Sequence, residues 1–487
     1  MGRPAPTSLT LCVSALALAC VSSGEPPISD AEADGVADGG DTTTLTPDPS
    51  EESNSQGSGA GQDEHFDDDD GSDPACSDTN CNQIDLLLVI DNSGTMGEEQ
   101  LALGPALSQL LDQLHGLTDK DGAPVHADVN IMVTSTDVGH PLCEPFAPDG
   151  YVPLAGAPQQ TPCIDRLEDF TGLGADPLMF QQACTDICPF PVGPANDPYI
   201  HFEGPQGSTT NIPGNEVEAA LHCLAPQGIN GCGYESPLEA MLQAINPEAS
   251  WNQGNSPFLR DGAMLAVVVM TDEADCSVLP PEGYALFVDQ DTYWEVNPDT
   301  NTKTQATSAV CWNAGVDCGM PDMDGTFPDC VSLDTGALHP VNRYRAYLED
   351  ELIEHQNKNV VMLGIVGVPP VTAHNPRPPF EPTAGGVADL LYREWKDGPY
   401  PSGDMLPGDL DPAHKQFQFG IGPGCTSEDG MGGFRGQAIP PVRLREVCEG
   451  LDEPDRVRCC LESICDNDYS AAFTCLGGMI QWSIDPS

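Results

Sequence analysis

Two short segments of this sequence carry oxygen-bearing side chains at a spacing that suits a bound metal ion. They are Asp91-Asn92-Ser93-Gly94-Thr95 and Thr271-Asp272-Glu273-Ala274-Asp275. Alternate residues of the first segment (Asp91, Ser93 and Thr95) can present three oxygens from one tight turn, because the glycine between them permits a sharp bend. A hard cation such as Mg²⁺ prefers six oxygens in an octahedral array. The two segments therefore predict a divalent metal site.

Each segment directly follows an apolar run that predicts a buried β-strand. Residues 84–90 and 264–270 are almost continuously apolar, which is typical of strands covered on both faces of a parallel sheet. In open sheets of this kind, ligands bind beyond the carboxyl ends of the strands. If the two strands are neighbours, Asp272 supplies a carboxylate from the side opposite Asp91.

The rest of the chain alternates strand and helix patterns. Further strands are predicted at 129–133 and 360–366, and the spacing of apolar residues predicts helices at 103–114, 216–223, 237–245, 341–355 and twice within 437–487. Pro105 is expected to bend or delay the first helix. This alternation predicts an α/β fold with a doubly wound, mostly parallel sheet flanked by helices.

The N-terminal part predicts export. Residues 1–19 have the basic start and short apolar core of a signal peptide, and Cys20 after the expected cleavage site resembles the lipidated cysteine of a bacterial lipobox. Residues 20–75 form an acidic linker with almost nothing to bury, so disorder is expected there. The only expected membrane attachment is a lipid on Cys20, at the outer membrane or in the periplasm; without that lipid the protein is expected to be secreted.

The cysteine content agrees with export. Of 20 cysteines, those outside the signal peptide and Cys20 could form nine disulfides, a density typical of oxidising compartments. Zinc-finger spacing is disfavoured because Cys76/Cys81 and Cys184/Cys188 lack a second nearby pair or a paired histidine. Cysteine-rich insertions at about 138–212, 274–338 and 369–436 are expected to be pinned by disulfides.

The composition narrows the possible partners. The chain has 17 basic and 76 acidic residues, a formal net charge of −59. Nucleic acid is excluded as a partner, because phosphate binding needs clustered Lys and Arg. The ten histidines are scattered, and His140, His201 and His339 are interpreted as loop or surface residues rather than as ligands.

The run from Leu87 to Met96 resembles the start of a von Willebrand A domain. Residues 271–277, together with residues 463–470, are similar to large secreted cysteine-rich bacterial members of that family. Family members bind a metal through an Asp-x-Ser-x-Ser loop, a later Thr and a later Asp. The resemblance assigns Asp91, Ser93 and Thr95 to the loop and Asp272 to the later Asp. It implies such a domain over 76–370 and a cysteine-rich extension, 371–487, packed on it.

The later threonine of the family is missing here. Its expected place precedes the helix predicted at 237–245, where Glu235 or Ser236 could substitute. Asp137, Glu273 and Asp275 are candidates for supporting the ligands. The implied cofactor is Mg²⁺, with Mn²⁺ or Ca²⁺ as alternatives.

The resemblance implies a function in adhesion or scaffolding at the cell envelope, without catalysis. In the family, a carboxylate of a protein partner completes the coordination of the ion. One alternative is a structural envelope protein whose vestigial loop is only a hydrogen-bonded turn. A remote alternative is a phosphatase of the haloacid dehalogenase type, which needs a second Asp where this chain has Ser93, and serine cannot act as the general acid.

Overall fold

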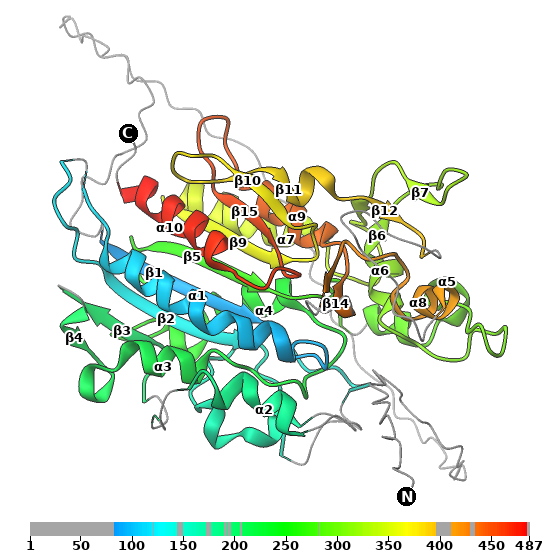
Figure 1. Cartoon of the computed structure of the whole chain (residues 1–487), viewed down its shortest axis with the longest axis horizontal. Helices are drawn as coiled ribbons and strands as arrows, with labels where there is room; N and C mark the ends of the chain where they lie inside the picture. The colour runs from blue at the N-terminus through cyan, green and yellow to red at the C-terminus, as the bar shows by residue number, and fades with distance from the viewer. Residues whose placement is uncertain are drawn as a thin grey trace, which may run out of the picture. The chain divides into compact units, whose positions relative to one another are not determined.

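The computed structural model describes residues 82–484 except 120, 144–149, 172–176, 189–191, 193–195, 205–206, 281, 396–410 and 429–433 (Figure 1). These residues belong to one compact unit, Pro74–Ser487. The signal peptide, Cys20 and the linker predicted at 20–75 lie outside the described residues. So do Cys76 and Cys81.

A seven-stranded sheet forms the centre of the unit (Figure 1), in the order β15-β9-β5-β1-β2-β3-β4. From β15 to β2 all neighbours are parallel, whereas β3 and β4 are added antiparallel. The bounds are β1 Gln83–Ile90, β2 Asp128–Ser135, β3 Ile200–Glu203, β4 Thr209–Thr210, β5 Met264–Met270, β9 Val360–Val366 and β15 Cys459–Ser463.

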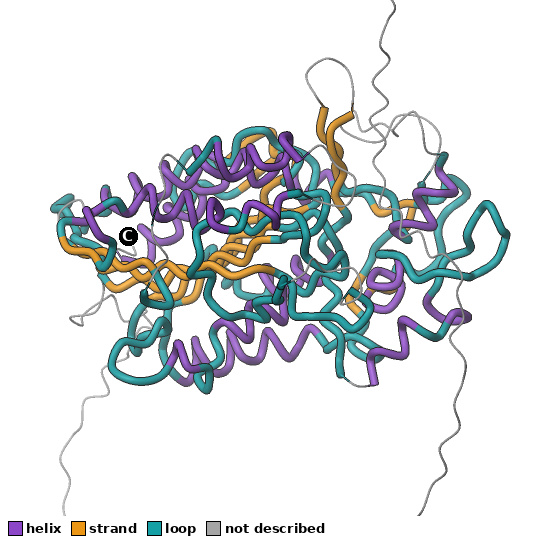
Figure 2. The backbone as a smooth tube through the Cα atoms, turned by 90° about the horizontal axis from the view of Figure 1, so that it is seen from below, coloured by secondary structure: helices purple, strands orange, loops and turns teal. Residues whose placement is uncertain are grey.

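Helices cover both faces of this sheet (Figures 1 and 2). Alternate side chains of each parallel strand enter two separate cores, as the period of two in a strand requires. One core is shared with α1 (Gly97–His115), α3 (Val217–Leu224) and α10 (Ser470–Ile484). The other is shared with α4 (Pro237–Ala244), α7 (Val341–Ala346) with its π-helical continuation Tyr347–His355, and α9 (Val442–Glu449).

The predicted α/β class with a mostly parallel, helix-flanked sheet is confirmed. Pro105 lies inside α1, so it does not delay the start of that helix. The expectation for the C-terminal extension is corrected: besides its two helices it contributes a strand, β15, which pairs in parallel with β9. The C-terminal extension therefore contributes one strand, Cys459–Ser463, to the central sheet. The strand is short and rich in cysteine, so its apolar pattern was weak.

The insertions contain short helices and strands that are connected by disulfides, as predicted. Within the described residues every cysteine is paired, in eight disulfides, which indicates an oxidising, extracytoplasmic environment. The helices are α2 Pro177–Thr185, α5 Gln290–Tyr293, α6 Ala309–Gly315 and α8 Pro412–Phe419. The strands are β6 Val316–Asp317, β7 Thr326–Phe327, β8 Val331–Ser332, β10 Val371–His374, β11 Pro382–Gly385, β12 Tyr392–Arg393, β13 Cys425–Glu428 and β14 Phe434–Ala438. In the described part of the chain, no helix has the length and apolar character needed to cross a membrane.

Candidate metal centre

The two oxygen-bearing segments meet where the strand order reverses. The chain winds from β1 to β2 on one side and from β5 to β9 and β15 on the other, so β1 and β5 flank the switch point. Their last residues, Ile90 and Met270, are paired in register. Asp91 and Thr271 therefore leave the same edge of the sheet side by side, which is where open α/β sheets bind ligands.

Asp91 is fully buried and organises its own turn. Its Oδ1 accepts a hydrogen bond from Ser93 N at 2.7 Å, and its Oδ2 accepts one from the Thr271 hydroxyl. The hydroxyls of Ser93 and Thr95 lie 3.2 Å apart. Ser93 is buried whereas Thr95 is exposed, so the turn runs from the sheet edge to the protein surface.

Glu235 enters the site from the loop before α4. Its side chain is fully buried, and Oε2 accepts a hydrogen bond from the hydroxyl of Thr136, the residue after β2. The other candidate, Ser236, donates its hydroxyl to the carbonyl of Cys276 at 2.9 Å. Of the two candidate residues before α4, Glu235 lies close enough to Asp91 for each to shift the pKa of the other, whereas the Ser236 hydroxyl is engaged by Cys276.

Asp272 closes the opposite side of the site. The residue is 6% exposed, and the nearby Thr95 side chain acts to lower the pKa of its carboxyl group, against the larger effect of burial. Its backbone carbonyl accepts a hydrogen bond from Ile439 N at 2.8 Å. The C-terminal extension thus holds the backbone of this ligand candidate in place.

The carboxylates of the site are crowded and desolvated. Burial raises the pKa of Asp91 to about 6, against the hydrogen bonds from Thr271 and Ser93. Burial raises the pKa of Glu235 and of Asp272 well above their usual values, and the charge of Asp91 raises both further. Burial and Asp91 raise the pKa of Glu273 to about 8. The main charges acting on these groups are other carboxylates, with no Lys or Arg of the described residues among them. Such a cluster favours a bound cation.

Unpaired oxygens give a direct test of whether a cation fits. Asn92 Oδ1, Glu235 Oε1 and Asp272 Oδ1 are buried and have no hydrogen-bond partner among the described residues. A buried acceptor without a donor costs about 1–3 kcal/mol, more when charged. Glu235 Oε1 and Asp272 Oδ1 belong to the crowded carboxylates and are oxygen donors of the kind that a hard cation prefers, whereas Asn92 Oδ1 lies against Gly231.

The spacing of the carboxylates limits how they could bind one ion. In the described residues, Asp91, Glu235 and Asp272 do not form a group whose ligand atoms all lie within 4.8 Å of one another. Direct binding by all three would need closer approach. An ion here would therefore use the Ser93 and Thr95 hydroxyls and water for the remaining positions, and Mg²⁺ commonly keeps several waters.

The predicted supporting residues have distinct roles. Asp137 organises the loop after β2: it accepts hydrogen bonds from Gly139 N at 2.8 Å, the Tyr151 hydroxyl at 2.8 Å and Cys232 N at 3.1 Å. Glu273 lies close enough to Asp91 for the two charges to interact.

Asp275 points away from the site. It forms a buried ion pair with Arg443 at 2.8 Å and accepts a hydrogen bond from Leu238 N in the first turn of α4. It therefore fixes α4, whose preceding loop carries Glu235.

Gln100 on α1 positions the site and was missed by the sequence analysis. Its Nε2 donates to Asp91 O at 2.9 Å and to Gly228 O at 2.7 Å, and its Oε1 accepts from Gln227 N at 2.9 Å. It is fully buried. Gln100 precedes the helix predicted at 103–114, and its spacing of three residues from Leu103 was the available signal.

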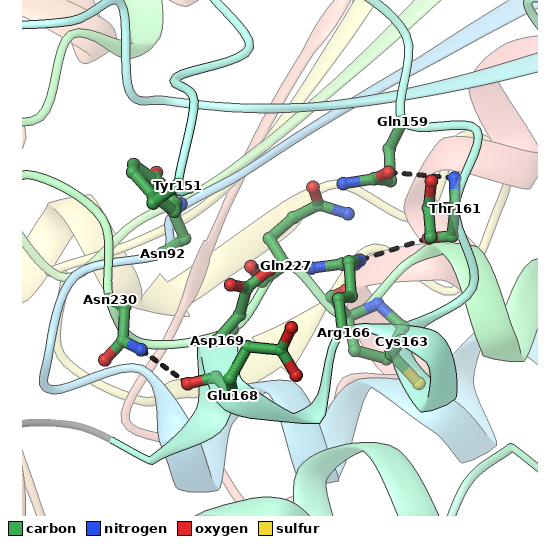
Figure 3. A network of polar contacts seen from close by, with 12 residues as sticks. Asn92, Tyr151, Gln159, Thr161, Cys163, Arg166, Glu168, Asp169, Gln227 and Asn230 are labelled. Atoms are coloured by element: carbon green, nitrogen blue, oxygen red, sulfur yellow. Dashed lines mark hydrogen bonds and ion pairs between the residues drawn. The ribbon is translucent and has the colours of Figure 1, made fainter. Parts of the chain in front are cut away.

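A hydrogen-bond network that involves the first insertion supports the loop leading to Glu235 (Figure 3). Arg166 donates to Thr161 O at 3.1 Å and to Gln227 O at 3.0 Å, and Asn230 donates to Glu168 O at 2.6 Å. Gly231 N then donates to Asn92 O at 2.8 Å, and a Cβ at Gly231 would overlap the Asn92 side chain. The insertion therefore fixes the loop that leads to Glu235 against the Asp91 turn.

Fold and site together define an α/β protein with a buried carboxylate cluster at the topological switch point of its sheet. Comparisons with protein-family models, curated proteins and solved structures found no match.

The metal-free protein is expected to lose stability as the pH rises from 7 to 9. The pKa of Glu273 is raised to about 8 from 4.5, so the folded state holds a proton that the unfolded chain releases. That contribution is complete below about pH 4.5 and is lost as the pH rises through 8; between pH 7 and 9 the loss is about 1 kcal/mol. Urea unfolding in chelator measures it. Glu273→Gln should reduce the slope of the profile, and a flat wild-type profile would contradict the electrostatics described here.

Proposed function

We propose that this protein is a von Willebrand A-like protein that binds a divalent cation, Mg²⁺ in the first instance, at Asp91, Ser93, Thr95, Glu235 and Asp272. The observation that carries the proposal is the set of unpaired buried oxygens among mutually repelling carboxylates. Mn²⁺ and Ca²⁺ are the alternatives, because they accept the same oxygen ligands.

The ion would serve to bind a protein partner. Thr95 and Gly94 are exposed, so one side of the turn faces solvent and a partner's carboxylate can approach there. A chain with net charge −59 repels acidic ligands unless an ion reverses the local field. Adhesion or scaffolding at the cell envelope is the resulting function, with anchoring through a lipid on Cys20 as a further part of the proposal. Catalysis is not proposed, since Ser93 stands where a phosphatase of the haloacid dehalogenase type needs an acid.

A structural envelope protein with a vestigial site is the second candidate. It is favoured by the hydrogen bonds that already use both oxygens of Asp91 and by the spacing of the carboxylates. Pull-down of envelope proteins with and without chelator separates the two: capture that needs the metal supports adhesion.

Substitution of the residues before α4 tests the ligand assignment. We expect Glu235→Gln to weaken Mg²⁺ binding by about tenfold or more, since it removes a charge directed at Asp91. Ser236→Ala is the matched control, because that hydroxyl serves Cys276 O, and its affinity should stay within about twofold of wild type. Calorimetric titration measures both. Equal effects, or a larger effect at Ser236, would overturn the assignment of Glu235.

A further inference from the structure

A histidine and two cysteines meet beside the loop that carries Glu235. His140, Cys143 and Cys232 each offer one ligand atom, and these atoms all lie within 4.8 Å of one another. Cys143 and Cys232 form a disulfide across 89 residues of sequence. In this oxidised state the sulfurs are not available as thiolate ligands.

The His140 ring is held in a neutral, metal-competent form. Its Nδ1 accepts a hydrogen bond from Leu142 N at 3.1 Å, so the ring proton is on Nε2 and the lone pair on Nδ1. Nε2 is buried without a hydrogen-bond partner among the described residues. The ring packs against Phe287, Tyr234 and Tyr284 at centroid distances of 3.9, 5.3 and 5.3 Å. Burial lowers the pKa of His140 to about 4, and neutral imidazole is the ligand form.

We propose that His140, Cys143 and Cys232 form a second metal site, for a soft divalent cation such as Zn²⁺, when their disulfide is reduced. A dithiol or phosphine reductant supplies two electrons, the S–S bond breaks, and each sulfur takes one proton. Binding of the ion releases those two protons and leaves two thiolates and one imidazole nitrogen as ligands, with water in the fourth position. Ligation through Nδ1 replaces the Leu142 contact and keeps the proton on Nε2.

This disulfide is among the more accessible ones of the described residues. Cys143 is partly exposed, as is Cys318, whereas the remaining disulfide cysteines are buried. Cys318 pairs with Cys330, and among the described residues no third ligand joins this pair in such a group. The Cys318–Cys330 disulfide is therefore a matched control of similar exposure.

The ion would restore a link that reduction breaks. The disulfide joins the loop after β2 to the loop before α4, and Cys232 N also donates to Asp137 Oδ2 at 3.1 Å. A metal bound to the same three residues would close the same connection without the covalent bond. The site thus shares no ligand with the Asp91 centre, although it stabilises the loop before α4 that carries Glu235.

Co²⁺ titration of the full chain after limited phosphine reduction, with the reduced pair verified by mass mapping, tests the proposal. We expect one Co²⁺ with a thiolate charge-transfer band, retained in a Cys318→Ser/Cys330→Ser variant and lost in Cys143→Ser/Cys232→Ser. His140→Ala, which keeps both cysteines, should weaken binding by about tenfold or more. Absence of the band when Cys143 and Cys232 are reduced, its persistence without them, or unchanged affinity in His140→Ala would overturn the proposal.

Discussion

Replacing Asp91 with asparagine is expected to stabilise the metal-free protein and to abolish Mg²⁺ binding. Burial raises the pKa of Asp91 from 3.8 to about 6, which corresponds to roughly 3 kcal/mol against the ionised form at neutral pH. Asparagine keeps the shape of the side chain and one acceptor for Ser93 N. The free energy of unfolding in chelator should therefore rise by about 1–3 kcal/mol, while Mg²⁺ affinity should fall by about 100-fold or more.

Asp137→Asn is the matched control for this experiment. Asp137 accepts three hydrogen bonds from its own and neighbouring loops, so its amide analogue should lower the stability of the metal-free protein. Urea unfolding with chelator and with saturating Mg²⁺ gives both quantities. A destabilised Asp91→Asn variant that still gains stability from Mg²⁺ would contradict the assignment of Asp91 as a ligand.

Replacing Arg443 with methionine is expected to lower the free energy of unfolding by about 3–5 kcal/mol. Arg443 forms an ion pair with Asp275 at 2.8 Å, and both side chains are buried. Arg443 also donates a hydrogen bond to His339 O at 2.6 Å. Without the guanidinium, Asp275 keeps a buried charge and has no cation to balance it. The loop after β5 and the start of α4 depend on that aspartate, so both would be affected.

Arg445→Met provides the comparison on the same helix. Arg445 pairs with Glu449 one turn along α9, and both side chains are about a third exposed or more. Exposed pairs of this kind contribute about 1 kcal/mol or less. Similar losses for Arg443→Met and Arg445→Met would show that the buried pair does not hold the C-terminal extension to the site.

The core of the fold could be predicted because its strands are buried on both faces. Residues 84–90, 264–270 and 360–366 are almost entirely apolar, and the structure places them as adjacent parallel strands. The pattern of β15 is mixed, because three of its residues are Cys459, Cys460 and Glu462. The strands β3 and β4 lie in an insertion that shows no apolar periodicity. Their pairing depends on contacts distant in sequence, which local patterns do not carry.

The candidate site was predictable where its residues follow those strands. Asp91 and Asp272 are fixed by the ends of β1 and β5, whereas the choice between Glu235 and Ser236 depends on where Thr136 and Cys276 O lie. Asp275 was expected beside the site, but its partner Arg443 is 168 residues away in sequence.

His140 was interpreted as a loop or surface residue. The structure buries it at 9% exposure among aromatic rings, because the insertion after β5 folds over the loop that carries it. The sequence distance between these segments hid this packing.

Anomalous diffraction from crystals grown with Mn²⁺ tests the metal centre most directly. We predict one strong peak at the carboxyl edge of β1 and β5, within bonding distance of Ser93 and Thr95 hydroxyls and bordered by Asp91 and Asp272. Asp91→Asn crystals should lose that peak. A map with no peak at this edge, or with Mn²⁺ bound only at the surface group Asp128, His201 and Glu203, would contradict the proposed centre.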